Sequence, residues 1–362
     1  MTQLLKPGIH WLFVFIPIAF ALDYLHASAP LIFFSAALSI IPIAHLIGSS
    51  TEQLASYTGD AIGGLFNATF GNAPELIICI VALNAGLHEM LLASLAGAVI
   101  GNMLLAMGVS FLVGGLKFHN QEYNPTSIRM YSSMMMVAVI SLMVPSAFHL
   151  FFGTSIHNEN ENTLNLGLSI ILLIAYGLYL VFMLKTHPDF FRSKSNEKED
   201  EVKEERWSMK RAITSLVLAS LLAALMSEIL VGAAEETGKV MGMSSVFIGV
   251  IFLAVIGGAA ESISAVTMAS KGKMDLSIGI LLGSSIQIAL FVAPVLVLLS
   301  LVVGSGQMNL AFSRMLIIIL FLCVLLGAMI AGDGRSNWYK GVQLIIMYVI
   351  IAMMIFFLPA AS

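Results

Sequence analysis

Two glutamate residues, Glu75 and Glu261, lie within long apolar segments and occupy equivalent places in an internal repeat. A constant offset of 186 residues aligns residues 62–104 with residues 248–290 without a gap, with 13 identities in 43 positions. Chance matches of Ile and Leu are common in apolar segments, but matched glycines and a matched glutamate are not. A carboxylate at the centre of a membrane span costs about 2.5–3.5 kcal/mol on insertion scales, and such residues usually mark function. Both glutamates are therefore candidates for binding cations and protons.

Helix-breaking residues stand beside both glutamates. Pro74 removes a backbone donor and disfavours a helical conformation of the preceding residue, and Gly71 lowers helix propensity further. The second copy has the glycine pair Gly257 and Gly258 instead. A break within the membrane frees carbonyl oxygens, and such oxygens beside a carboxylate form a hard site that suits Ca²⁺. Two carboxylates neutralise one divalent cation, and without it their repulsion and lost hydration favour bound protons. This competition predicts exchange of Ca²⁺ for H⁺.

Neutral polar residues near the two glutamates could complete this site. Asn72 precedes Glu75, and the spans that follow the two glutamates carry Asn102, Ser284 and Gln287. Their oxygens could bind the cation directly. Alternatively, these side chains only join helices that small residues allow to pack closely.

Two further acids, Glu52 and Glu228, precede the two repeats at similar distances. They could form approach sites for cations on the two sides of the membrane. Each could equally be a residue at a helix end whose charge reaches the aqueous boundary.

The composition predicts the elements that hold these residues. Of 362 residues, 59% are hydrophobic and 10% are charged, whereas a soluble domain has about 25% charged residues. The mean hydropathy is +0.95. Apolar stretches of about 18 residues or more can cross a bilayer core of about 30 Å. We predict an all-α membrane protein with about eleven transmembrane helices, near residues 10–26, 30–50, 61–86, 90–115, 128–152, 164–185, 209–231, 245–270, 275–303, 311–331 and 337–359.

Basic residues test this count, because they accumulate on the cytoplasmic side. With eleven spans, all 17 Lys and Arg residues lie on one face except Lys239 and Arg314. The N-terminus is thus predicted in the cytoplasm and the C-terminus outside. The first span has an alternative, because its short apolar run and Ala27-Ser28-Ala29 resemble a cleaved signal peptide.

Five spans in each repeat make the two halves inverted with respect to each other, as in secondary transporters with alternating access. The predicted division is a peripheral first helix at 1–28, a first five-helix repeat at 29–185, an acidic cytosolic linker helix at 186–208 and a second repeat at 209–362. The acidic segment 197–205 is either a solvated linker of mixed charge or a cytosolic cation sensor.

At these motifs the chain resembles the calcium/proton exchanger (CAX) branch of the cation/calcium exchanger superfamily. The resemblance covers nearly the whole chain and is carried by residues 51–52, the string GGLFNATFGN at 63–72 and residues 333–338. It implies one peripheral helix plus two inverted five-helix repeats, and possible assembly as a homo-oligomer such as a trimer. The implied essential glutamates are Glu75 and Glu261. The residues implied as further ligands and gating groups are Asn72, Asn102, Ser284 and Gln287.

The chain also departs from the family pattern at three positions. Pro74 stands where the first motif has valine, and Gly258 and Ser262 replace the asparagine and histidine of the usual second motif, GNAAEH. The same fold could instead use Na⁺ as the driving ion or carry another divalent cation.

Other classes of function fit less well. A channel would conduct without counter-transport, and an inverted duplication of a broken helix favours a transporter. An enzyme is not expected, because His88-Glu89 has Leu92 where a zinc protease motif has its second histidine, and no G-x-S-x-G or phosphate-loop motif occurs. We expect no cofactor and no nucleic acid partner, only Ca²⁺, protons and the lipid bilayer. The expected location is a bacterial or archaeal plasma membrane.

Overall fold

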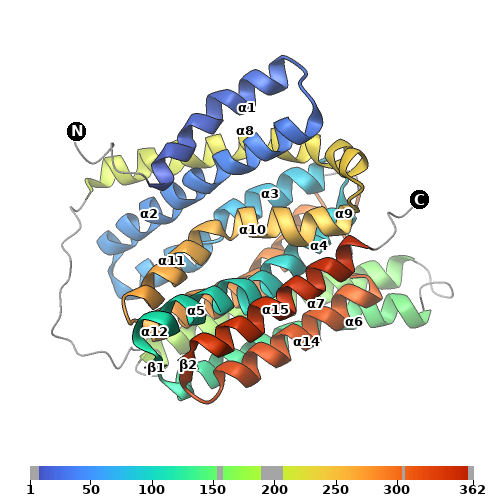
Figure 1. Ribbon diagram of the computed structural model, residues 1–362. Coiled ribbons are helices and arrows are strands. Elements are labelled where there is room, and N and C mark those ends of the chain that lie inside the picture. The colour runs from blue at the N-terminus through green and yellow to red at the C-terminus, as the bar shows by residue number, and fades with distance from the viewer. Residues whose placement is uncertain (1–7, 153–157, 189–206, 304–305, 358–362) are drawn as a thin grey trace.

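A computed structural model describes residues 8–152, 158–188, 207–303 and 306–357 of the chain. The fold is a bundle of long apolar helices that lie nearly side by side (Figure 1). Helices α1, α2 and α8 lie along one side of this bundle, and α14 and α15 lie along the opposite side. The predicted first helix is a 3₁₀ turn at Ile9–Val14 followed by α1 at Phe15–Tyr24. Most of the predicted linker helix, residues 189–206, falls outside the described residues.

The first half contains the following elements: α2 (Ala29–Phe70), α3 (Ala73–Asn84), α4 (His88–Ile100), a π-helical segment η2 (Gly101–Ala106), α5 (Met107–Phe118), strand β1 (Asn120–Glu122), α6 (Pro125–Phe152), α7 (Asn158–Val181) and a π-helical segment η3 (Phe182–Thr186). The second half contains α8 (Met209–Met241), α9 (Ser245–Phe247), π-helical η5 (Ile248–Leu253), α10 (Ala254–Gly257), α11 (Ala259–Ser270), α12 (Met274–Gln287), π-helical η6 (Ile288–Val292), α13 (Ala293–Leu299), α14 (Arg314–Ala331), strand β2 (Arg335–Asn337) and α15 (Trp338–Phe356).

The predicted all-helical membrane architecture is confirmed. Among the described residues, eight helices are long and apolar enough to cross a membrane, and a ninth span is possible if the bent pair Ser245–Gly257 and Ala259–Ser270 counts as one. Two shorter apolar helices cover Ile9–Tyr24 and Ala73–Asn84. The count of eleven spans stays a prediction.

The predicted break at residues 51–60 is wrong. Helix α2 continues from Ala29 to Phe70, so the predicted segments 30–50 and 61–86 are not separated there. This stretch has Gly59 but no proline. Polar residues do not interrupt backbone hydrogen bonding in a helix, and one glycine is tolerated. The helical break comes later, between α2 and α3 at residues 71–72.

A two-stranded antiparallel ladder, which the sequence did not predict, joins the halves at one end of the bundle. Strand β1 pairs with β2 so that Gln121 faces Ser336 and Glu122 faces Arg335. At the same end, Lys117 Nζ donates to the Ser270 carbonyl at 2.8 Å. These contacts place the loops after α5, α11 and α14 together, as the distribution of basic residues predicts.

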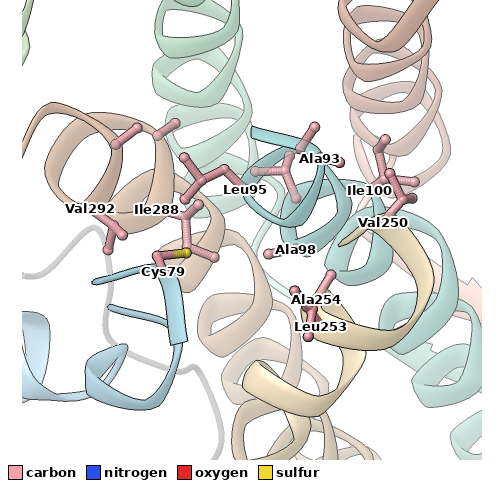
Figure 2. Close-up of a cluster of buried hydrophobic side chains, with 14 of the residues drawn as sticks. Cys79, Ala93, Leu95, Ala98, Ile100, Val250, Leu253, Ala254, Ile288 and Val292 are labelled. Carbon is pink, nitrogen blue, oxygen red and sulfur yellow. The ribbon is translucent and has the colours of Figure 1, made fainter. Parts of the chain in front are cut away.

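The core of the bundle is built around α4. Thirteen residues form this helix, and ten of them, Met90, Leu91 and Ala93–Ile100, are buried. Figure 2 shows Ala98 and Ile100 of α4 near Val250, Leu253 and Ala254 of the second half. At this contact a Cβ on Gly97 would come within 2.5 Å of the Val250 Cα and carbonyl oxygen. Only glycine therefore allows α4 to approach η5 so closely.

Candidate ion-binding site

Both glutamates occupy the same position in the two halves, directly after a break in a helix. Glu75 is the third residue of α3 and Glu261 is the third residue of α11. The axes of the helices before and after Gly258 differ by 60°. A helix that ends inside the membrane leaves its last carbonyl groups without helical partners. Each break thus brings a helix end next to a carboxylate.

The carboxylate of Glu75 is enclosed by the protein. The residue is 5% exposed, and neither carboxylate oxygen has a hydrogen-bond partner among the described residues. It packs against the second half, because a Cβ on Gly257 would lie only 3.0 Å from the Glu75 Cγ. Glu261 is partly exposed, and its Oε2 is buried without a partner. Buried polar groups without partners are costly, so these oxygens suit a bound cation or proton.

A network of amides and a hydroxyl joins the two halves beside the glutamates. Asn72 Nδ2 donates to Gln287 Oε1, and Ser284 Oγ donates to Asn72 Oδ1 at 2.8 Å. Asn102 Nδ2 in turn donates to Ser284 Oγ at 3.3 Å. The four residues predicted as further ligands therefore lie together and hydrogen-bond to one another.

π-Helical segments position two of these side chains. Segment η2 begins at Gly101, next to Asn102, and η6 begins directly after Gln287. At the repeat offset of 186 residues, η6 corresponds to residues 102–106 of η2. Single-turn π-helical bulges often occur at functional sites. Their recurrence was not predicted, because no residue type in either segment specifies a π turn.

A cavity of about 310 Å³ leads from Glu261 toward the end of the bundle that carries the β1–β2 ladder. Its inner wall contains Gly71, Asn72, Glu261, Ser284 and Gln287. Its outer wall contains Ser127 near the start of α6 and Asp275 near the start of α12. Ions in water can therefore approach Glu261 from this end, and we call this space the entry cavity.

Acids other than the two glutamates differ in their relation to the entry cavity. Glu52 lines its wall, as does Asp275, whose Oδ1 accepts from the Asn124 backbone N–H at 2.6 Å. Glu228 is exposed on α8 and lines no described cavity. Sequence reasoning missed Asp275, because an acid in the first turn of a helix is common for electrostatic reasons alone.

The fold and the site together define a secondary transporter built from two related halves that each contribute a broken, glutamate-bearing helix. The chain matches the sodium/calcium exchanger protein family over residues 28–185 and 211–357. It therefore belongs to this family, which consists of transporters and not of enzymes.

Curated relatives and solved structures support this assignment. The chain is 39% identical to the Ca(2+)/H(+) antiporter of Aphanothece halophytica, with 96% of each chain covered. It is 40% identical to the Ca(2+)/H(+) antiporter ChaA of Bacillus subtilis, covering 95% of this chain and 97% of that protein. The structure of native YfkE superposes with a TM-score of 0.84 at 37% identity, covering 97% of this chain and all of that chain. An H⁺/Ca²⁺ exchanger CAX structure has a TM-score of 0.72 at 12% identity and shares the fold.

Proposed function

We propose that this protein exchanges Ca²⁺ for H⁺ across a membrane by alternating access. The observation that carries the proposal is the duplicated helix break beside Glu75 and Glu261, with three of their four carboxylate oxygens buried and without a hydrogen-bond partner among the described residues. Relatives named Ca²⁺/H⁺ antiporters at 38–40% identity support the choice of both ions.

The proposed chemistry is competition between one divalent cation and protons. With Ca²⁺ bound, both carboxylates are ionised and their charges balance the cation. Oxygens of Asn72, Ser284 and Asn102 lie beside them and are the neutral ligands that a hard cation prefers. When Ca²⁺ leaves, two neighbouring charges in a poorly hydrated site are unfavourable, so protons bind instead. The protonated protein can then change access back to the first side. A site that holds two charged carboxylates and no cation makes this change much less readily.

The two halves also supply the two access states. Gly97 packs against Val250, while its repeat equivalent Gly283 lines the entry cavity and a Cβ there would meet nothing within 4 Å. The site is thus open along α12 and closed along α4. If the two halves exchange conformations, Gly283 becomes closely packed and the path beside Gly97 opens. This exchange transfers access from one side of the membrane to the other.

The test is ⁴⁵Ca²⁺ uptake into proteoliposomes with an imposed pH gradient. Wild-type protein is expected to take up Ca²⁺ in proportion to the gradient. Glu75→Gln and Glu261→Gln each remove one ionisable group and are expected to abolish gradient-driven uptake. Asp23→Asn is the control, because Asp23 is exposed on the peripheral helix α1 and lines no described cavity, and it should transport like the wild type.

Sodium provides the contradicting outcome. Uptake that follows a Na⁺ gradient and does not respond to the pH gradient would show that Na⁺, and not H⁺, is the driving ion. Uptake that survives both glutamine substitutions would remove the two glutamates from the mechanism. A conductance that needs no opposing ion gradient would instead indicate a channel.

We further propose that the entry cavity faces the cytoplasm and that the protein exports Ca²⁺ from a bacterial or archaeal cell. The support is the basic residues at that end, among them Lys117, Lys271 and Arg335. Both native cysteines are buried, so single new cysteines can report orientation. Lys271→Cys should react with an impermeant maleimide only from the cytoplasmic side, and Lys239→Cys only from outside. The reverse pattern would invert the proposed topology.

Assembly as a homo-oligomer, such as a trimer, is proposed from the resemblance to the calcium/proton exchangers. Light scattering of the purified protein, corrected for bound detergent, distinguishes a trimer from a monomer of 38.8 kDa. A monomer that exchanges ions at the full rate would remove assembly from the proposed mechanism.

A further inference from the structure

The internal repeat differs at three positions of the site. Asn72 of the first half corresponds to Gly258 of the second, and Ser284 and Gln287 of the second half correspond to Ala98 and Gly101 of the first. One side of the site therefore holds the Asn72–Ser284–Gln287 network. The equivalent side has three residues that carry no polar side chain.

A second cavity, of about 450 Å³, lies on this side, and we call it the lateral cavity. Its walls are mainly apolar and come from α2, the α4–α5 region and α10–α11. Gly258, Ala98 and Gly101 all line it, and a Cβ on Gly101 would meet nothing within 4 Å. Val255, which also lines it, is 39% exposed. Because these helices are apolar and long enough to cross a membrane, we expect this side of the cavity to face the lipid chains.

Oxygen atoms surround the inner end of the lateral cavity at Gly258. The three atoms nearest to a Cβ placed on Gly258 are the Ala254 carbonyl oxygen at 3.4 Å, Glu75 Oε1 at 3.6 Å and Asn102 Oδ1 at 3.9 Å. Two of these are hydrogen-bond acceptors without charge, and the third belongs to a buried carboxylate whose oxygens have no partner in the described part of the chain. An ammonium group has three donors and no acceptor, so it complements these oxygens. The Ala254 carbonyl, which already accepts the Gly258 N–H at 3.0 Å, offers its second lone pair.

We propose that the lateral cavity binds lipophilic primary amines, with the ammonium group at Gly258 beside Glu75 and the apolar tail among Leu105, Val109 and Val266. The volume lies in the range of pockets for small organic ligands, about 300–1,000 Å³. The ammonium group occupies the place that the Asn72 side chain fills in the other half. Because it contacts Glu75, the bound amine excludes Ca²⁺ from the site and stops exchange.

The experiment compares octylammonium with octanol, which has the same tail and no charge. The first readout is the thermal unfolding midpoint of the purified protein, measured without Ca²⁺, because a ligand that binds the native state raises it. Octylammonium is expected to raise the midpoint and octanol is not. In Glu75→Gln the increase should disappear. This readout does not depend on the proposed exchange activity.

Two substitutions fill the cavity at residues away from the glutamates. Val109→Phe and Val266→Phe place an aromatic ring in the tail region from opposite walls, and they should weaken octylammonium binding about tenfold, because an overfilled cavity excludes the tail. Val137→Phe is the matched control, because Val137 is 55% exposed on α6 and lines no described cavity. Two filling variants allow the test to proceed if one of them fails to fold.

The second readout is inhibition of ⁴⁵Ca²⁺ uptake, and this arm rests on the proposed function. Octylammonium should raise the KM for Ca²⁺ and leave the maximal rate unchanged, with the inhibition weakened in Val109→Phe. If wild-type protein shows no exchange but the thermal shift follows the expected pattern, the proposed function fails and the amine site stands. Equal shifts by octanol would indicate a site for uncharged lipid tails and overturn the proposal. Equal octylammonium shifts in the wild type and both filling variants would also overturn it.

Discussion

Gly97 and Gly283 occupy the same position in the two repeats and yet have opposite surroundings. Gly97 lies against the backbone of Val250, so that even a methyl group would overlap it, whereas Gly283 has open space on the wall of the entry cavity. Identical residues at equivalent positions cannot by themselves produce this difference. It shows that the two halves adopt different conformations, and under the proposed alternating access the close contact at Gly97 is the one that would form and break.

The largest expected effect on exchange comes from substituting Gly283, the glycine of this pair that has open space around it. Gly283→Val fits the present conformation, because nothing lies within 4 Å of its Cβ. It should prevent α12 from making the close contact that α4 makes now, since overpacking costs about 1–3 kcal/mol or more. We expect folded protein whose exchange rate falls by about 5–150-fold, the range that corresponds to such a cost. Measurements of ⁴⁵Ca²⁺ exchange and of thermal stability together check this.

An exchange rate in Gly283→Val equal to that of the wild type would show that Gly283 never becomes closely packed. Gly177 on α7 is a suitable control, because a Cβ there also meets nothing within 4 Å, and the residue is exposed and lines no described cavity. Gly177→Val should transport normally.

The next effect concerns the Asn72–Ser284–Gln287 network, which has no counterpart on the repeat-equivalent side of the site. Asn72→Gly removes the acceptor of Ser284 and the donor to Gln287. A buried polar group left without its partner costs about 1–3 kcal/mol, so the KM for Ca²⁺ should rise about tenfold. Concentration series of ⁴⁵Ca²⁺ uptake measure it. An unchanged KM would mean that the network serves only helix packing.

The reciprocal substitution makes the two halves more alike. Gly258→Asn is sterically possible, because Gly258 has φ −79° and its Cβ would make only ordinary contacts. The added amide would lie near Glu75 and Asn102, and we expect a change of the KM for Ca²⁺ of about threefold, the size of a single net hydrogen bond of about 0.5–1.5 kcal/mol. Loss of folded protein would show that the lateral cavity cannot accept a side chain at this position.

A smaller effect is expected at the loop between α14 and β2. Lys340 Nζ contacts both carboxylate oxygens of Asp333 at 2.6 Å. Partial burial by itself would raise the pKa of Asp333, but the hydrogen bond and charge of Lys340 outweigh this and lower it. A lowered pKa stabilises the folded state above the pKa of the unfolded chain, and this stabilisation is lost as the pH falls through the folded-state pKa.

Asp333→Asn should therefore lower the thermal midpoint slightly at neutral pH and have no effect at the acid end. The size should be that of exposed ion pairs, about 0–1 kcal/mol. Thermal unfolding of both proteins between neutral and acid pH checks the sign. A difference that grows as the pH falls would contradict the assigned ion pair.

The sequence alone predicted the membrane architecture, the duplicated motif and the two glutamates at breaks, because these depend on local composition and on glycine and proline. It could not predict the continuous helix through residues 51–60, since polar residues are compatible with a helix. It also could not show which half is open. Gly97 and Gly283 are the same residue, and their difference arises only from tertiary packing. The place of Asp275 in the wall of the entry cavity could not be predicted either, because it too arises only from tertiary packing.

The π-helical segment η2 also determines how α5 is rotated about its own axis. An α-helix turns by about 100° per residue, so the extra residue of a π turn changes the direction in which all later side chains point. Downstream, Gly108 and Gly115 face α15 so closely that a Cβ on either would contact the backbone of Gly341 or Trp338. Deleting one residue of η2 would leave α5 helical but turn these glycines away from α15 and place larger side chains there. A single inserted residue thus sets the rotation of α5 about its axis. The packing of α5 against α15, the last helix, depends on that rotation.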